Sequence, residues 1–220
     1  MTHYCLIYTI INQHYNTFRA NEFFEVSSLS ILNIRTLPDP LLRQKAKRVQ
    51  KIDSSVRQLV ADMIDTMRDA NGVGLAANQV GVLKRVVVIE IPGEDQVRVL
   101  INPEIVRREG EREIEEGCLS IPGYRGELKR SVKVRARALD VDGKPIRVKA
   151  DGLLAQALEH ETDHINGILY VDHLEDHQKL YRLEYHSSDE DNDATSPDTA
   201  RSISELVLPT IESLKKPPTT

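Results

Sequence analysis

Apolar residues recur at helical spacing over residues 56–67 of this chain. Their offsets of 0, 3, 4, 7, 8 and 11 place them on one face of a helix: Val56, Leu59, Val60, Met63, Ile64 and Met67. Asp53 or Ser54 is suited to cap the first turn, and the segment from Asn71 to Gly74 is a turn that ends the helix.

A second helix is predicted over roughly Gly152 to Ile165. Its buried stripe consists of Leu153, Leu154, Ala157 and Leu158, and Asn166-Gly167 is a natural stop. Because His160 and His164 extend the face of Leu153 and Ala157, we expect both imidazoles to lie inside the protein.

The segments between the two helices have the pattern of strands. Residues 85–91 form a β-branched run that predicts a buried strand, with residues 97–101 as its partner. Residues 132–138 alternate between small apolar and basic side chains, and Asp142-Gly143 then predicts a hairpin turn into Ile146 and Val148. The fold class that follows is α+β, with mainly antiparallel strands around a central helix that carries residues 160–164.

Charge and composition divide the chain into three parts. Residues 1–29 form an N-terminal extension of unknown role, residues 30–183 form the folded body, and residues 184–220 form an acidic tail that we expect to be disordered. The tail holds eight acids and three bases, and the rest of the chain sums to zero. A neutral body gives no electrostatic case for nucleic-acid binding, and no apolar run is long enough to span a bilayer.

The clearest chemical signal is His160-Glu161-Thr162-Asp163-His164, an H-E-x-x-H motif. On a helix, residues four apart share a face, so both imidazoles can reach one metal ion. Glu161 is adjacent to the first histidine and is placed to act as a general base without binding the ion.

A catalytic metal site needs a third protein ligand. In metzincin proteases this ligand is a histidine at the position that Tyr170 occupies here. We interpret His173 and His177 as exposed polar residues. Cys118 is the better candidate because a thiolate binds borderline-soft divalent ions well, and we expect it to lie in a loop beside Gly117.

Three segments together resemble the peptide deformylase family. They are residues 72–79 (GVGLAANQ), residues 116–120 (EGCLS) and residues 160–164 (HETDH). The resemblance extends from about Ser30 to about Leu183. It implies an α+β hydrolase that removes the formyl group from the N-terminal formylmethionine of newly synthesised proteins and releases formate.

The resemblance also implies a role for each matching residue. Cys118, His160 and His164 would hold one divalent ion, most often Fe2+, with Zn2+, Ni2+ or Co2+ as substitutes. Glu161 would be the general base, and the Gln79 side chain and the Leu119 backbone N–H would stabilise the oxyanion. Gly72, Gly74 and Arg125 would contact the peptide.

Two other hypotheses remain: the chain is a protease of the H-E-x-x-H class, or it is a non-enzymatic protein with a structural ion. The deformylase hypothesis implies formylmethionyl nascent peptides as partners and a cytoplasmic location, without membrane association or direct nucleic-acid binding. It leaves room for a transient ribosome contact, although the acidic tail argues against docking through residues 184–220.

Overall fold

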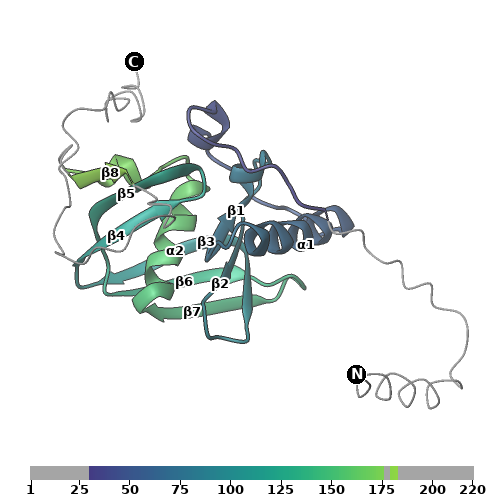
Figure 1. The fold of residues 1–220 in the computed structure, drawn as a ribbon. Coiled ribbons are helices and arrows are strands. Elements are labelled where there is room, and N and C mark those ends of the chain that lie inside the picture. Colours follow the sequence, from purple (N-terminus) through teal and green to yellow (C-terminus); the bar gives the residue numbers. More distant parts are fainter. Residues whose placement is uncertain (1–29, 176–178, 183–220) are drawn as a thin grey trace, which may run out of the picture.

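The long helix α1 (Ser54–Asp69) forms where the apolar stripe predicts, and the Asp53 carboxylate accepts a hydrogen bond from Val56 N–H at its first turn (Figure 1). The computed structural model describes residues 30–175 and 179–182. The N-terminal extension, His177 and the acidic tail lie outside these residues. Among the described helices, none is long and apolar enough to cross a membrane.

The larger of two sheets has five strands in the order β1-β2-β3-β6-β7, and every neighbouring pair is antiparallel. The predicted strand pair and the predicted hairpin are both confirmed. The strands are β1 (Gly74–Ala76), β2 (Val86–Glu90), β3 (Val97–Glu109), β6 (Lys133–Leu139) and β7 (Pro145–Asp151). Gly74 was predicted to end a turn, but it begins strand β1.

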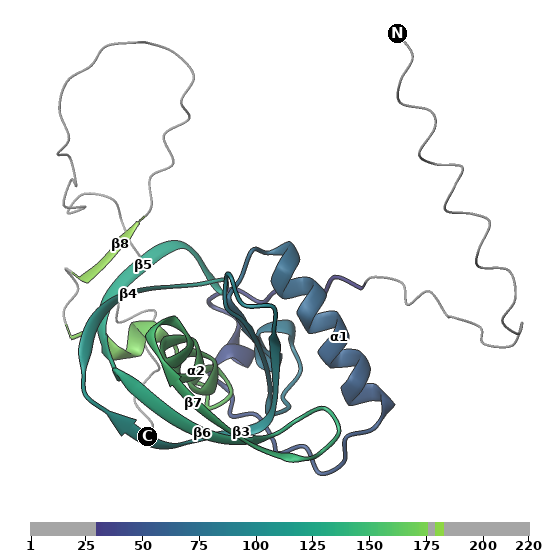
Figure 2. The same ribbon diagram turned by 90° about the horizontal axis from the view of Figure 1, so that it is seen from below.

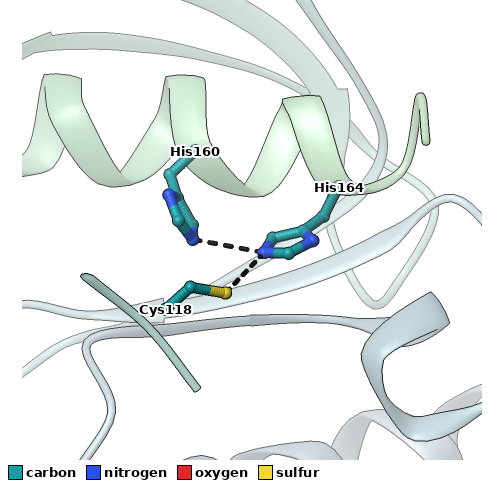
Figure 3. A group of neighbouring side chains, drawn as sticks. All are labelled: Cys118, His160 and His164. Carbon is teal, nitrogen blue, oxygen red and sulfur yellow. Dashed lines mark hydrogen bonds between the residues drawn. The ribbon is translucent and has the colours of Figure 1, made fainter. Parts of the chain in front are cut away.

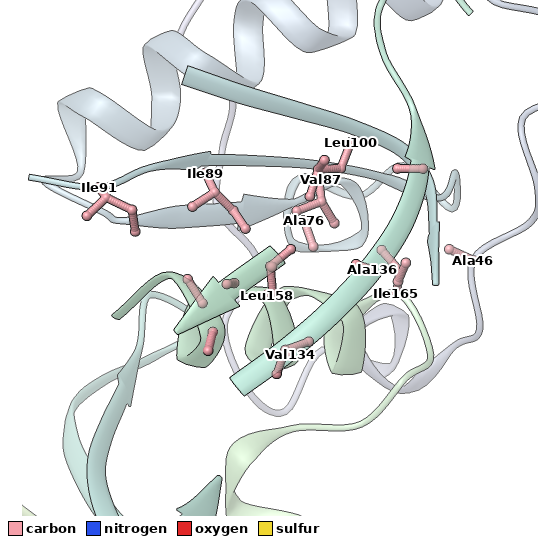
Figure 4. Close-up of a cluster of buried hydrophobic side chains, with 14 residues drawn as sticks. Ala46, Ala76, Val87, Ile89, Ile91, Leu100, Val134, Ala136, Leu158 and Ile165 are labelled. Carbon is pink, nitrogen blue, oxygen red and sulfur yellow. The ribbon is translucent and has the colours of Figure 1, made fainter. Parts of the chain in front are cut away.

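Helix α2 (Gly152–His164) directly follows β7 and packs on the inner face of this sheet (Figure 1, Figure 2). Leu158 and Ile165 meet Val87, Leu100 and Val134 in one apolar cluster, which Figure 4 shows between helix and strands. Each fully buried aliphatic side chain of this kind contributes about 1.5–3 kcal/mol. The cluster fixes α2 against the sheet and so places the H-E-x-x-H segment in the interior.

Helix α1 packs on the opposite face of the same sheet, against Val86 and Val88, whereas α2 packs against Val87 and Ile89. Its residues Val56, Val60, Met63 and Met67 are buried against β1 and β2, in a second apolar cluster that also includes Ile101. This packing supports β1, and the short 3-10 helix η2 (Ala77–Val80) follows β1 directly.

The second sheet has three strands in the order β4-β5-β8 and was not predicted from the pattern. Its strands are β4 (Arg112–Cys118), β5 (Ile121–Arg130) and β8 (Leu180–Arg182). Charged residues dominate β4 and only Ile114 is apolar among its first five residues, so no alternation marks it as a strand. An apolar cluster joins this sheet to the 3-10 helices η1 (Pro40–Arg43) and η3 (Tyr170–His173).

The turn after α2 depends on Gly167. Its φ of +75° is a conformation that side-chain-bearing residues rarely adopt, and a Cβ there would lie 2.4 Å from the Arg43 carbonyl oxygen. Ala46 N–H donates to the Ile165 carbonyl nearby, at 2.9 Å, so the turn is held against the chain that follows η1.

We predict that Gly167→Ala destabilises the protein more than Gly93→Ala does. Gly93 has a φ of +84° but open space around its Cβ position, so its replacement adds only left-handed strain, about 1–2 kcal/mol. At Gly167 the backbone clash adds a further ~1–3 kcal/mol. Urea unfolding of both variants measures the difference. Equal losses in the free energy of unfolding would show that the contact of residue 167 with Arg43 is not tight.

Candidate metal centre and active site

Three side chains from two parts of the chain converge on one point. Cys118 Sγ lies 3.1 Å from His164 Nε2, which lies 3.2 Å from His160 Nε2 (Figure 3). The candidate donor atoms of all three residues lie within 4.8 Å of one another. The sequence predicted this set, although spacing alone could not bring Cys118 to the helix.

The fold positions each donor separately. His160 and His164 are four residues apart on α2, so both rings leave the same face of the helix. Cys118 is the last residue of β4, where a register shift between Gly117 and Cys118 interrupts the pairing with β5. The expected loop is therefore the end of a strand, and the irregularity turns the thiol toward the helix.

The geometry and chemistry of these donors fit a divalent ion. Imidazole nitrogens at about 2.0–2.1 Å from a tetrahedral ion lie ~3.3 Å apart, close to the 3.2 Å between the two Nε2 atoms. A thiolate sulfur at about 2.3 Å from the ion would lie ~3.5 Å from each nitrogen, so the 3.1 Å between Cys118 Sγ and His164 Nε2 would widen slightly. One thiolate and two imidazoles suit zinc, iron, nickel or cobalt better than magnesium or calcium, which prefer oxygen. Three protein donors would leave one position of a tetrahedron for a reactant.

A buried carboxylate holds the first histidine in place. Glu116 Oε1 lies 3.3 Å from His160 Nδ1, so Nε2 is the ring nitrogen directed to the cluster. Arg130 in turn donates to Glu116, from Nη2 at 2.9 Å and from Nε at 3.3 Å. Glu116 belongs to the motif at residues 116–120, but the sequence alone predicts no role for it.

The same arginine also reaches α2. Arg130 Nη1 donates to Asp163 Oδ2 at 2.6 Å, and the same carboxylate oxygen lies 2.8 Å from His173 Nε2. Sequence reasoning missed Arg130 and Asp163. Asp163 is one of the two variable positions of H-E-x-x-H, and a buried acid at that place requires a cation from another element. His173 is exposed, as predicted, and lies outside the donor cluster.

Glu161 is isolated from these ion pairs. Its side chain is buried, and its Oε2 has no hydrogen-bond partner among the described residues. Burial raises the pKa of Glu161 to about 7, a range in which a carboxyl group both takes and returns protons near neutral pH. A Cβ on Gly74 would lie 2.5 Å from Glu161 Oε1, so only glycine leaves room for this carboxylate.

The two histidines have opposite electrostatic surroundings. Burial lowers the pKa of His160, but the hydrogen bonds and charges of Cys118 and Glu116 outweigh it and raise the pKa well above its ordinary value. Burial and the neighbouring His160 hold the pKa of His164 well below its ordinary value. The cluster thus attracts positive charge at His160, which is what a cation-binding site requires.

Gln79 lies beside the same cluster. Its Oε1 accepts a hydrogen bond from Ala76 N–H at 2.8 Å, which fixes the amide so that Nε2 points to the site. Nε2 donates to Ser120 Oγ at 3.2 Å and lies 3.7 Å from Cys118 Sγ. A neutral amide donor is thereby held close to the thiol, next to Leu119.

A cavity of about 660 Å3 opens onto this cluster. Its wall includes Cys118, His160, Glu161 and Gln79 together with the other predicted contact residues, Gly72, Gly74, Leu119 and Arg125. Arg125 is at the rim and pairs with Glu115. Gln156 also lines the cavity, and its Nε2 donates to the Glu115 carbonyl at 3.1 Å.

A family model described as polypeptide deformylase matches residues 31–180. The chain belongs to the peptide deformylase family. The peptide deformylase of Dehalococcoides mccartyi is 54% identical over 155 residues, which cover 70% of this chain and 93% of the relative. That of Thermomicrobium roseum is 52% identical over 159 residues, or 69% of this chain and 90% of the relative.

Solved structures agree with this membership. A peptide deformylase from Legionella pneumophila is 51% identical and superposes with a TM-score of 0.65, over 66% of this chain and 86% of that chain. A peptide deformylase from Synechococcus elongatus, in complex with actinonin, is 46% identical. It superposes with a TM-score of 0.64, over 66% of this chain and 79% of that chain. The α+β fold class is confirmed, and the chain is an enzyme of the deformylase class.

We predict that Arg130→Met destabilises the protein by about 3–5 kcal/mol, because two buried carboxylates lose their shared cation. The matched control is Arg137→Met, whose partner Glu104 is exposed, and it should cost under about 1 kcal/mol. Urea unfolding measures both variants. A loss below about 1 kcal/mol for Arg130→Met would mean that Glu116 and Asp163 find other partners or are protonated.

Proposed function

We propose that this chain is a metal-dependent hydrolase that removes the formyl group from the N-terminal formylmethionine of newly synthesised proteins. The observation that carries the proposal is the convergence of Cys118, His160 and His164 beside the isolated carboxylate of Glu161. Membership of the deformylase family supports the reaction, and the donor set supports the metal.

In this proposal Cys118, His160 and His164 hold one divalent ion, with Fe2+ as the first candidate and Zn2+, Ni2+ or Co2+ as substitutes. Such an ion would lower the pKa of a water molecule and polarise the formyl carbonyl. The buried carboxylate of Glu116 keeps His160 oriented for this role through its contact with Nδ1.

Glu161 moves the proton in the proposed reaction. It takes a proton from the attacking water and gives it to the methionine nitrogen as the C–N bond of the formamide breaks, which leaves a free amine and formic acid, and the acid then loses its proton to become formate. Burial disfavours the charged form of the Glu161 carboxyl group and so favours its uptake of a proton in this transfer. The room that Gly74 leaves at Oε1 lets the carboxylate lie close to the reacting atoms.

Gln79 and Leu119 are the proposed oxyanion donors. The carbonyl oxygen of the formamide gains negative charge as water adds, and Gln79 Nε2 and the Leu119 backbone N–H would donate to it. Ala76 N–H fixes the amide of Gln79 before any substrate binds, so no reorganisation is needed at the moment of reaction. Loss of such a donor typically slows a reaction about a hundredfold or more.

The cavity fits the start of an extended peptide. Gly72 and Gly74 allow the peptide backbone to approach β1 closely, and Arg125 at the rim is placed to meet residues that follow the methionine. The deformylase of Synechococcus elongatus was crystallised with actinonin, and we expect actinonin to bind this cavity too. A cytoplasmic location and a transient ribosome contact stay predictions.

Protein purified without oxygen should release formate from a formyl-Met-Ala-Ser peptide and contain one metal ion per chain. A chelator should remove both the ion and the activity. The measurement combines a formate assay with elemental analysis, which also identifies the ion. A filled site without formate release would count against the proposal.

Two variants separate metal binding from catalysis. Glu161→Ala should keep the ion and lose at least about a hundredfold in kcat, the lower end of the range for acid–base groups. Cys118→Ala should lose the ion, whereas His173→Gln, a change at a nearby histidine outside the donor cluster, should keep a full equivalent. A full equivalent of metal in Cys118→Ala would refute the ligand assignment.

Gly74→Ala should reduce kcat about a hundredfold, because the added methyl group displaces the Glu161 carboxylate and a shift near 1 Å has effects of this size. Gly117→Ala is the matched control beside Cys118. Its Cβ would meet the nearest atoms at 3.6 Å, an ordinary contact, so the loss should be under about tenfold. Steady-state kinetics compare the two variants, and equal losses would show that room at Oε1 is not limiting.

A further inference from the structure

The outer face of the larger sheet concentrates basic side chains. Lys133, Arg135 and Arg137 alternate with buried residues along β6, and Arg147 and Lys149 alternate with half-buried or buried residues along β7. All five are exposed and point away from α2, because they alternate with residues that face the core.

Strand register brings like charges directly opposite one another. Arg135 pairs with Lys149 on one side and with Arg107 on the other, and Arg137 pairs with Arg147. Like charges at opposite positions destabilise a sheet. Within residues 30–175 and 179–182, no ion pair is formed by Lys133, Arg147 or Lys149.

The surface continues beyond the sheet into the segment after η1. The backbones of Lys47 and Lys84 form an isolated parallel β-bridge. The pKa of the neighbouring Arg85 is lowered mainly by burial and also by the charge of Arg48. The hydrogen bond from Arg137 holds the pKa of Glu104 below its usual value, and Arg48 and Arg85 act in the same direction. Glu104 is therefore the acid that interacts with Arg137, Arg48 and Arg85 where the sheet meets the segment after η1.

We define the basic face as nine bases with three acids among them, a net charge of +6. The bases are Lys47, Arg48, Lys84, Arg107, Lys133, Arg135, Arg137, Arg147 and Lys149, and the acids are Glu104, Glu109 and Asp151. Such a face raises the local concentration of anions.

The chain itself carries a segment of matching charge. Residues 184–200 hold six acids and neither lysine nor arginine, a net charge of −6 with histidine neutral. The acids are Glu184, Asp189, Glu190, Asp191, Asp193 and Asp198. This segment follows β8, which lies on the other side of the fold from β6 and β7 (Figure 1, Figure 2).

The tether is long enough to reach the basic face. Eighteen residues, 183–200, span up to about 60 Å when extended. A domain of this size has a radius of gyration of only ~15 Å. A tethered segment also has an effective concentration on the order of millimolar, which favours it over a free anion of equal charge.

We propose that residues 184–200 dock on the basic face and occupy it against external polyanions. The attraction is between exposed charges and is therefore weakened by salt. The face and the segment lie outside the candidate active site, so the inference does not depend on the proposed function.

Zero-length carbodiimide cross-linking of the full chain, read by mass spectrometry, tests the contact. Links should join the acids of residues 189–193 to Lys149, Lys133, Lys84 or Lys47 within one chain, and they should disappear at about 0.5 M salt. Lys129 is the control, because it lies on β5, the strand that pairs with β8, and outside the basic face. Links mainly to Lys129, or evenly to all exposed lysines, would overturn the proposal.

A double-mutant cycle with heparin as the probe tests whether residues 184–200 shield the basic face from external polyanions. One change converts Asp189, Glu190, Asp191 and Asp193 to their amides, and the other is Arg135→Gln with Lys149→Gln. Amide substitution should raise the salt needed to elute the protein from heparin, and most of this gain should vanish when the face is neutralised. The proposal would be wrong if the two changes shifted the elution salt concentration additively, or if the unmodified chain were retained as strongly as the amide variant. Either result would show that the face is open to external polyanions.

Discussion

The C-terminal half of α2 imposes the main physical constraint on this fold. The six residues from Glu159 to His164 are all polar and all buried. A buried charge without a partner destabilises a protein by several kcal/mol, so the surrounding elements supply partners for most of these residues, whereas Glu161 Oε2 has none among the described residues. Arg108 and Ser131 contact Glu159, Glu116 contacts His160, and Arg130 contacts Asp163.

This constraint explains why two sheets are needed around one helix. The larger sheet covers the apolar face of α2, whereas the cations, carboxylates and thiol that complete its polar face come mostly from β4, β5 and their ends. Arg130, at the end of β5, binds both Glu116 of β4 and Asp163 of α2. This side chain therefore ties the smaller sheet to the helix, together with the contact of Glu116 with His160 and the hydrogen bond from Gln156 to the Glu115 carbonyl.

The sequence predicted the parts of the fold that have regular periodicity and missed the parts held by charge. Both α-helices, the pairing of β2 with β3 and the β6–β7 hairpin followed from apolar spacing. The strands β4 and β5 carry few apolar residues at regular spacing, so pattern could not find them or place Cys118 at the end of one. Resemblance to a family grouped the three motifs, but only the structure gave Glu116, Arg130 and Asp163 a physical role.

The balance of buried charge explains why the donor cluster suits a cation. Cys118 as a thiolate, Glu116, Glu161 and Asp163 would place four negative charges around His160, against one guanidinium from Arg130. Such an excess in a largely buried site is unfavourable and raises the affinity for protons or for a divalent ion. Within the described part of the chain, no cationic side chain is bonded to Glu161, so among these acids it is the one left free to exchange a proton with a substrate in the adjacent cavity.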